Sequence, residues 1–342
     1  MFAGDRGDHV LNRAERVLVA GAGGFIGGHL VRYLAAQGFA EIRAVDILPV
    51  ARWSQPAPAA ECVELDLRDR AAAAAAVAGC AAVVNLAAET GGMGFVSQHG
   101  AAAMLSAAIS AQLLEAARDA GVARYFFASC AGVYPAGLQQ LADAPGVPEQ
   151  DVYPAMPPDG SGWAALFSER LAQQFEADFG LTVRIARLHS VYGPHCAWEG
   201  GRERAPAALC RKIAEAILAG ADEIEIWGDG NQTRSFLHVD DCVRGMLLIL
   251  DGAVGQPCNL GSAELVSVNQ LADVVEEIAG VRLKRRYQLA APAGVRGRTS
   301  DNARLREALG WEPAITLREG MTGTYRWIAS QVSARTLTGR RG

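Results

Sequence analysis

The stretch "RVLVAGAGGFIGGHLVRYLAAQG", residues 16–38, constrains the fold more than any other part of the sequence. A short apolar strand runs into a glycine turn, and an amphipathic helix follows the turn. Gly21, Gly24 and Gly27 give the turn a GxxGxxG spacing. Glycines at these places allow a tight turn and let the backbone amides at a helix N-terminus approach a phosphate group. The stretch therefore predicts the first unit of a sheet that binds a dinucleotide.

Apolar strands and longer helices alternate through the first half of the chain. Strands are predicted within residues 41–47, 81–88, 123–134 and 181–193, with helices at 105–121 and 158–175. This alternation predicts an α/β fold, a Rossmann-type doubly wound parallel sheet with a smaller C-terminal substrate-binding lobe. The segment "IEIWGDGNQTRSF" predicts a hairpin. The expected boundaries are 15–191 plus 238–265 for the dinucleotide-binding domain and 192–237 plus 266–331 for the lobe, with loose tails at 1–14 and 332–342.

The composition excludes several classes of function. A net charge of −5 argues against non-specific nucleic-acid binding. Apolar runs are expected to fall short of transmembrane length, and the polar first residues do not resemble a signal peptide, so we expect a cytoplasmic protein without a membrane partner. The 7 cysteines include no CxxC pair, which predicts reduced thiols and no metal site.

An acidic residue at the end of the second strand indicates which dinucleotide is bound. Asp46 follows Gly21 by 25 positions, and a carboxylate there binds ribose hydroxyls and repels a 2′-phosphate. NAD is therefore favoured over NADP, although a tight turn without a ligand is the alternative. Asp66 and Leu67 either flank the adenine or form a plain surface turn. The predicted cofactor-binding residues are Gly21, Gly24, Phe25, Ile26, Gly27, Asp46, Asp66, Leu67, Leu86 and Ala87.

Several motifs together resemble the extended short-chain dehydrogenase/reductase family. The glycine turn, "NLAA" and "VYGP" match its general pattern. The stretches "LAAETGGMGF", "YGPHCAWEGGRERAPAALCRK", "IWGDGNQTRSF" and "GVRGRTSDN" resemble the GDP-mannose 3,5-epimerases within it. The resemblance covers residues 15–330. It implies bound NAD, a GDP-sugar as substrate, and a homodimer formed through the helices at 105–121 and 158–175.

The same resemblance implies a mechanism whose reacting groups this chain lacks. In the family, NAD+ oxidises the sugar at C4, a Cys and a Lys exchange the C3 and C5 protons, and a Tyr takes the C4 hydroxyl proton with help from a Lys and a Ser. By alignment with those motifs, Cys130 stands at the helper Ser and Gly132 at the epimerising Cys. Arg204 stands at the proton-exchanging Lys, while Ser161 and Ala165 stand at the Tyr and its Lys.

These replacements remove the usual proton transfers. A serine hydroxyl is a far weaker acid than a phenol of pKa about 10. Arg204 stays protonated and cannot shuttle a proton near neutral pH. The only lysines, Lys212 and Lys284, do not follow a Tyr by four positions. We therefore expect hydride transfer by the usual family route to be absent.

Four other residues are candidates for catalysis. Cys130 would lie near the nicotinamide, whose positive charge favours a thiolate, unless it is a structural thiol. Ser161 could hydrogen-bond a substrate hydroxyl. Glu89 could act as a base if it is buried, and otherwise is a solvated carboxylate. His195 lies in a loop expected to reach the sugar, although a loop histidine is more often ordinary polar surface.

The predicted substrate-binding residues centre on arginines and glycines. Arg234 and Arg296 resemble arginines that clamp a pyrophosphate, the alternative being surface ion pairs. Arg204 is expected to hold an anionic or hydroxyl-rich group, and Trp227 either lines the nucleotide or packs locally. The full set is Gly92, Met93, Gly94, Ser190, Arg204, Ala205, Trp227, Arg234 and Arg296.

Three functions remain open from the sequence. The first is an enzyme that epimerises or otherwise rearranges a GDP-sugar with NAD bound and a rewired active site. The second uses the same scaffold for non-redox chemistry, as a lyase, a cyclase or an isomerase. The third is a catalytically inactive protein that binds a nucleotide sugar.

Overall fold

A seven-stranded parallel sheet forms the centre of the computed structural model, which describes residues 11–55 and 57–339. The strand order is β11-β6-β5-β4-β1-β2-β3, so the chain winds outward from β1 in both directions. This order confirms the predicted doubly wound fold. The strands are β1 (Val17–Ala20), β2 (Ile42–Asp46), β3 (Glu61–Glu64), β4 (Ala82–Asn85), β5 (Arg124–Cys130), β6 (Thr182–Leu188) and β11 (Cys258–Leu260).

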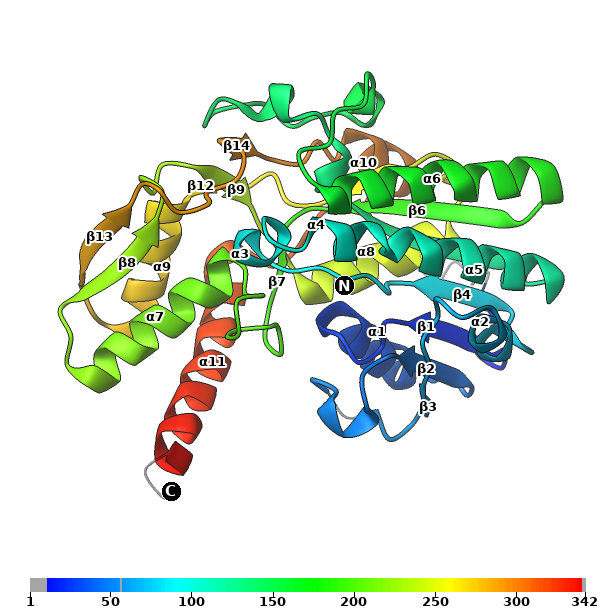
Figure 1. Ribbon diagram of the computed structural model, residues 1–342, viewed down its shortest axis with the longest axis horizontal. Helices are drawn as coiled ribbons and strands as arrows, with labels where there is room; N and C mark the ends of the chain where they lie inside the picture. Colours follow the sequence, from blue (N-terminus) through cyan, green and yellow to red (C-terminus); the bar gives the residue numbers. More distant parts are fainter. Residues whose placement is uncertain (1–10, 56, 340–342) are drawn as a thin grey trace.

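Helices cover both faces of this sheet (Figure 1). On one face, α1 (Phe25–Ala36) and α8 (Val239–Asp251) bury Leu30 and Met246 against Val17 and Val19. On the other, α2 (Arg70–Val77), α5 (Ser106–Asp119) and α6 (Gly160–Phe179) pack on Leu18 and Val83. Because neighbouring residues of β1 face opposite cores, the strand is apolar at every position.

A smaller lobe packs around its own core, seen at the left of Figure 1. Its helices α7 (Ala205–Ala219), α9 (Val268–Ala279) and α11 (Leu317–Gly339) enclose buried Ile213, Leu271 and Met321. Parallel strands β8 (Glu223–Trp227) and β13 (Lys284–Gln288) lie beside them. A three-stranded sheet joins β12 (Leu265–Ser267), β9 (Thr233–Ser235) and β14 (Gly297–Arg298). The paired segments β7 (Val191–Tyr192) and β10 (Leu237–His238) connect the lobe with the large sheet.

Three predictions about this organisation are wrong. The expected hairpin is absent, because β8 pairs with β13 while β9 pairs with β12 and β14. The helix α10 (Ala303–Leu309) was assigned to the lobe, yet Leu305 and Trp311 pack in the core of the large domain.

The third concerns the tails. Leu11 is only 3% exposed, and α11 continues through 332–339, so neither described segment is loose. The remaining tail residues, 1–10 and 340–342, lie outside the described part of the chain.

One stretch also overturns the expectation about apolar length. The continuous helix Gly100–Asp119, which includes α4 (Gly100–Met104) and α5, has a mean hydropathy of 1.3 and is long enough to cross a membrane. Helices of soluble cores meet the same criteria, and α5 packs against α2 and α6.

A buried polar network ties β5, β6 and α6 together. Arg187 forms two hydrogen bonds with Glu169, from Nε to Oε1 at 2.9 Å and from Nη2 to Oε2 at 2.7 Å. The Ser129 hydroxyl also donates to Glu169, at 2.5 Å. Arg187 further donates to Tyr134 Oη at 3.1 Å and to a backbone carbonyl, while Tyr134 donates to Asn259 at 2.6 Å. The guanidinium is thus neutralised inside the fold, as buried charges require.

Candidate active site

The glycine turn after β1 brings two segments of the large sheet into close contact. Gly21 has a φ of +83°, and a Cβ there would lie 2.8 Å from the carbonyl carbon of Leu86. A Cβ on Gly27 would lie 2.1 Å from the carbonyl oxygen of Gly21. Side chains are therefore excluded at both positions, and the residues after β4, Leu86 and Ala87, reach the turn as predicted for a dinucleotide site.

Asp46 lies at the same edge of the sheet. Its carboxylate accepts hydrogen bonds from the backbone N–H of Gly23 at 3.0 Å and of Leu48 at 2.9 Å. Gly24 precedes α1, whose first residues are Phe25 and Ile26. A carboxylate beside a glycine turn fits the ribose of an adenosine.

Trp53 is a residue near this site that the sequence analysis missed. Its ring lies 2.7 Å from the position of a Cβ on Gly23, and its Nε1 donates to the Leu48 carbonyl at 2.9 Å. No local motif marks it, since only the fold brings it against the glycine turn.

The segment expected to flank an adenine is less suited to that role. Asp66 pairs with Arg68 at 2.6 Å on the surface, and this neighbour lowers the pKa of the Asp66 carboxyl. Leu67 is 4% exposed and packs in the core, so its side chain does not flank a ligand. The surface-turn alternative therefore describes Asp66, whereas Leu67 is a core residue.

The ends of β5 and α6 meet at Cys130 and Ser161. A Cβ on Gly132 would lie 3.2 Å from the Cys130 Sγ, and one on Gly162 would lie 2.2 Å from the Gly132 carbonyl oxygen. Asp159 caps α6 and accepts hydrogen bonds from the backbone N–H of Ser161 and Gly162 at 3.0 and 3.1 Å. The Ser161 hydroxyl donates to the same carboxylate oxygen. The position of the family tyrosine therefore holds a serine and aspartate pair.

Asp159 was not recognised from the sequence. A detectable signal existed, because an aspartate directly before a helix is a frequent N-cap. The cap also places its carboxylate close enough to influence the charges of Cys130, Arg204 and Arg298.

The chemistry of Cys130 differs from the expected thiolate. Burial is the largest influence and raises the pKa of its thiol, and Asp159 acts in the same direction. Arg204 and Arg298 oppose this shift but are weaker influences. The protein alone therefore holds Cys130 as a protonated thiol at neutral pH, in contrast to the thiolate favoured from the sequence.

The glycine loop packs directly against the segment that carries Arg204. Gly92 donates its N–H to the Arg202 carbonyl at 2.9 Å, and a Cβ on Gly92 would lie 2.1 Å from the Glu203 carbonyl oxygen. Arg204 precedes α7, which begins at Ala205, and its Nη2 donates to Thr90 Oγ1 at 3.2 Å. The arginine remains open to solvent, yet the surrounding protein lowers its pKa by desolvation, as expected on the wall of a cleft.

Arg234 and Arg298 are neighbours in the three-stranded sheet. They are aligned partners of the parallel pair β9 and β14, so their side chains lie on one face. Arg298 Nε donates to Gln139 Oε1 at 2.5 Å, and Arg234 donates to the Val295 carbonyl at 2.7 Å. Desolvation, reinforced by Arg298, lowers the pKa of Arg234 to about 9.

Arg296 does not take the place expected for it beside Arg234. It forms an ion pair with Asp229 at 2.8 Å, and 39% of its side chain is exposed. Arg298, the second arginine of "GVRGR", is the partner of Arg234 instead. The ion pair favours the surface-pair alternative for Arg296, and Arg298 is a further candidate for the pyrophosphate that the sequence did not single out.

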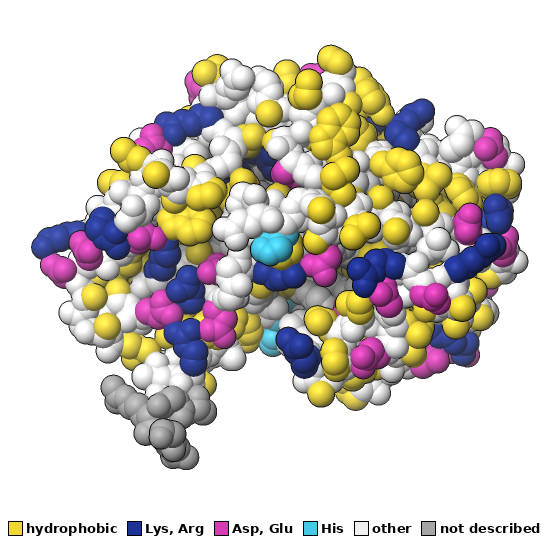
Figure 2. Space-filling model, in the orientation of Figure 1, with side chains coloured by type: hydrophobic (Ala, Val, Ile, Leu, Met, Phe, Trp, Pro, Cys, Tyr) yellow, Lys and Arg dark blue, Asp and Glu magenta, His cyan; other side chains and the backbone are white. Residues whose placement is uncertain are grey.

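Met93, Gly94 and Trp227 line the same region. A Cβ on Gly94 would lie 3.4 Å from the Trp227 ring, and one on Gly294 would lie 3.1 Å from Met93 Sδ and 3.3 Å from Arg234 Nη2. Ser190, just after β6, has a φ of 40° and accepts a hydrogen bond from the Leu237 N–H at 3.3 Å. The glycine loop of the large domain and the arginines of the lobe thus converge, and Figure 2 shows the surface hollowed between the two parts.

Two catalytic candidates lie in other surroundings. Glu89 is not buried as a base would require; it pairs with Arg202 at 2.9 Å, and 44% of its side chain is exposed. The His195 ring lies 5.9 Å from that of His29 on α1 and 5.0 Å from that of Trp327 on α11. These contacts favour a packing role for His195 over the catalytic one, and they differ from the plain polar surface offered as the alternative.

Both lysines lie far from the ends of β5 and α6. Lys212 donates to the Glu225 carbonyl at 3.0 Å, and Lys284 pairs with Asp222 at 2.7 Å. Both contacts are made within the lobe, so no lysine replaces the one missing from α6.

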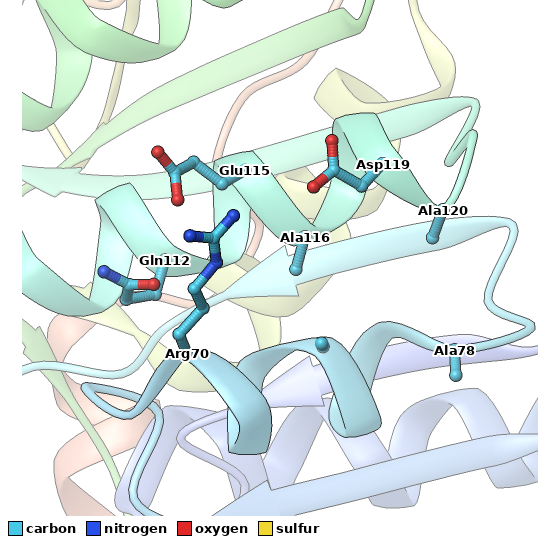
Figure 3. Close-up of a pocket in the computed structure, with 8 residues that line it drawn as sticks. Arg70, Ala78, Gln112, Glu115, Ala116, Asp119 and Ala120 are labelled. Carbon is cyan, nitrogen blue, oxygen red and sulfur yellow. The ribbon is translucent and has the colours of Figure 1, made fainter.

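A shallow pocket elsewhere, between α2 and α5, contains none of the candidate residues. Figure 3 shows Arg70, Gln112 and Glu115 in its walls. Within residues 11–55 and 57–339, no group of three or more His, Cys, Asp or Glu side chains could hold a metal ion.

Comparison with known proteins identifies relatives along most of the chain. Residues 17–261 match the model of the NAD dependent epimerase/dehydratase family. The chain is 40% identical to GDP-mannose 3,5-epimerase 1 of Oryza sativa subsp. japonica, over 93% of this chain and 82% of that protein. It is equally identical to GDP-mannose 3,5-epimerase of Arabidopsis thaliana, with 93% and 83% covered.

Solved structures share the whole architecture. UDP-glucose 4-epimerase of Thermotoga maritima with UDP-glucose has a TM-score of 0.82 at 27% identity, covering 93% of this chain and 99% of that one. MoeE5 in complex with UDP-glucose and NAD has a TM-score of 0.77 at 31% identity, covering 94% and 99%. The glycine turn and Asp46 fit the NAD of such proteins, and NAD is the cofactor of this scaffold. The chain therefore belongs to the NAD dependent epimerase/dehydratase family of nucleotide-sugar enzymes.

Proposed function

We propose that this protein is an enzyme that epimerises or otherwise rearranges a GDP-sugar. It uses NAD and an active site in which Ser161 and Ala165 replace the family's tyrosine and lysine. One observation carries the proposal: Arg204 and Arg298 lie close enough to Cys130 and Asp159 to influence their charges, and Arg298 is the aligned neighbour of Arg234. The 40% identity to GDP-mannose 3,5-epimerases favours guanosine as the nucleotide.

Each half of the site has a binding task. The glycine turn and the N-terminus of α1 would hold the NAD pyrophosphate, and Asp46 its adenosine ribose. Arg234 and Arg298 would hold the pyrophosphate of the sugar nucleotide, since guanidinium groups form charge-assisted hydrogen bonds with phosphate oxygens. When bound, NAD supplies a reversible oxidant for a sugar hydroxyl.

The reacting groups differ from those of the relatives. Cys130, held as a neutral thiol by its surroundings, is suited to donate a proton to a sugar carbon or oxygen. Ser161, hydrogen-bonded to Asp159, orients a sugar hydroxyl and passes its proton toward that carboxylate. Both groups lie at the N-terminus of α6, where the relatives place their tyrosine.

The assembly proposed is a homodimer. Large apolar side chains are exposed on the outer helices, namely Met104, Leu105, Trp163 and Phe167. Contiguous apolar surface of this kind marks interaction sites. Light scattering of the purified protein tests this, and a monomer at micromolar concentration would contradict it.

Isotope exchange tests the proposed activity. The NAD-loaded protein is incubated with GDP-mannose in D2O, and deuterium in the recovered sugar is measured by mass spectrometry. We expect incorporation, together with the absorbance of a reduced nicotinamide, and loss of incorporation in Cys130→Ala. Cys62→Ala is the matched control, because Cys62 lies on β3, at the edge of the sheet and away from the ends of β5 and α6.

A binding protein without catalysis is the second candidate. The replacement of the family tyrosine and lysine by Ser161 and Ala165 favours it. GDP-mannose that binds tightly yet returns unlabelled and unchanged, with Cys130→Ala making no difference, would establish this candidate in place of the enzyme.

A further inference from the structure

Arg204 and Arg298 reach the same point of the site from different elements. Arg204 precedes α7, and Arg298 lies on β14 of the three-stranded sheet. Each influences the charges of Cys130 and Asp159, and Arg204 also acts on Arg298. Both guanidinium groups therefore face the ends of β5 and α6, where the sugar ring has to lie.

Neither arginine is neutralised by the protein. Among residues 11–55 and 57–339, no Asp or Glu forms an ion pair with either. Their side-chain partners are neutral, Thr90 for Arg204 and Gln139 for Arg298. By contrast Arg202, two positions before Arg204, pairs with Glu89, and Arg296, two positions before Arg298, pairs with Asp229.

The nearest carboxylate is already engaged. One oxygen of Asp159 caps α6 by accepting from two backbone N–H groups and the Ser161 hydroxyl. A guanidinium group that faces a ligand site and has no carboxylate partner is free to form charge-assisted hydrogen bonds with an anion of the ligand. Arg234, which lies beside Arg298 and donates to the Ala293 and Val295 carbonyls, is placed for the pyrophosphate. Arg204 is then available for a second anion, because its side-chain partner, Thr90, is neutral.

We propose, on the basis of the nucleotide-sugar function above, that the sugar of the substrate carries a carboxylate, as in a hexuronic acid, and that Arg204 holds it. The planar guanidinium group matches a carboxylate in a paired geometry that a hydroxyl cannot reproduce. An arginine at position 204 is then a specificity residue rather than a lost proton shuttle.

Calorimetric titration of the NAD-loaded protein tests this assignment. The probes are GDP-mannose and GDP-mannuronate, which differ only in the C6 group. We expect the uronate to bind at least about tenfold more tightly, because hydrogen bonds to charged groups are the stronger ones. In Arg204→Met this preference disappears through weaker binding of the uronate, while GDP-mannose affinity changes less than about threefold.

Two further variants separate charge from folding. Arg202→Met removes a neighbouring arginine that already has a carboxylate partner, and it should leave the preference intact. Arg204→Lys keeps the charge and should retain part of the preference, with NAD affinity unchanged in all three variants.

The outcomes distinguish this inference from the proposed function. If GDP-mannose binds as tightly as GDP-mannuronate, or if Arg204→Met weakens both equally, the carboxylate assignment is overturned and the nucleotide-sugar function stands. If neither nucleotide sugar binds to protein that binds NAD, both fail.

Discussion

The buried Arg187 and the two arginines of the cleft, Arg204 and Arg298, show opposite arrangements in this molecule. Beneath β5 and β6, Arg187 is 3% exposed and meets both oxygens of Glu169, a tyrosine hydroxyl and a backbone carbonyl. In the cleft, Arg204 and Arg298 meet one neutral side chain each. The charge of Arg187 is neutralised within the fold by Glu169, whereas Arg204 and Arg298 have no carboxylate partner among the described residues and are available to an anion of the ligand. Charge that serves structure is paired by the chain, and charge that serves binding is left for the ligand.

The largest effect should come from breaking the buried ion pair of Arg187 and Glu169. Glu169→Ala leaves the Arg187 charge buried without its partner, and we expect a loss of about 3–5 kcal/mol in the free energy of unfolding. Urea denaturation followed by circular dichroism measures it. The control is Glu199→Ala, which removes an exposed partner of Arg335 and should cost about 0–1 kcal/mol. Equal losses in the two variants would remove the distinction between Arg187 and the arginines of the cleft.

A pH effect sharpens the same contrast. His189 Nε2 contacts Asn259 Oδ1 at 2.9 Å, its Nδ1 has no hydrogen-bond partner among the described residues, and burial lowers the pKa of its ring to about 4. In the unfolded chain the His189 ring keeps the higher pKa, near 6.5. Between about pH 6.5 and 4 the ring therefore binds a proton in the unfolded chain but not in the folded one. The contribution of His189 to the free energy of unfolding is therefore fully present above pH 6.5. It falls as the pH is lowered toward 4, by on the order of 2 kcal/mol.

The variant His189→Gln isolates this contribution. It should flatten the decline in unfolding free energy between pH 6.5 and 4, measured by urea denaturation at a series of pH values. A curve with the same slope as that of the unmodified protein would show that other groups cause the decline.

Removing Arg298 from the cleft should affect ligand binding and not the free energy of unfolding. Arg298→Met eliminates a desolvated charge without a counter-ion, so we expect an unfolding free energy within about 1 kcal/mol of the original. Affinity for a GDP-sugar should fall roughly 10–100-fold, the range for hydrogen bonds to a charged group. Calorimetry with the matched variant Arg296→Met, which removes the exposed partner of Asp229, should show less than about a threefold change.

The smallest effect concerns the reactivity of Cys130. Because burial raises the pKa of its thiol, alkylation by iodoacetamide should be slow at neutral pH and accelerate as the pH rises, by up to about tenfold per pH unit. Peptide mass spectrometry follows this residue separately from the other cysteines, with the unfolded protein as reference. Alkylation at pH 7 as fast as in the unfolded chain would show that the fold does not raise the pKa of Cys130.

Local patterns predicted the cofactor half of the molecule well. Gly21, Gly27 and Asp46 are close in sequence to the strands that position them, and the turn permits few geometries. The doubly wound order followed from the alternation of strands and helices. Such features depend on neighbours along the chain, which the sequence displays directly.

The predictions that the structure changed concern contacts between residues far apart in the sequence. The hairpin failed because β8 finds its partner in β13, far along the chain. Arg296 and Arg298 look equivalent in "GVRGR", and only Asp229, 67 positions away, shows which of them is neutralised. In the protein alone, burial raises the pKa of the Cys130 thiol more than the nearby arginines lower it, and burial is a property of the folded molecule that the sequence does not display.

The contact between Gly132 and Cys130 also limits how this protein could change in evolution. A new side chain at Gly132 would place its first carbon 3.2 Å from the Cys130 sulfur, while the α6 backbone at Gly162 blocks the neighbouring space. Regaining the relatives' cysteine at that position thus requires the Cys130 thiol to move or to be replaced first. A side chain at position 132 is therefore accommodated only if the Cys130 side chain gives way by a few tenths of an ångström.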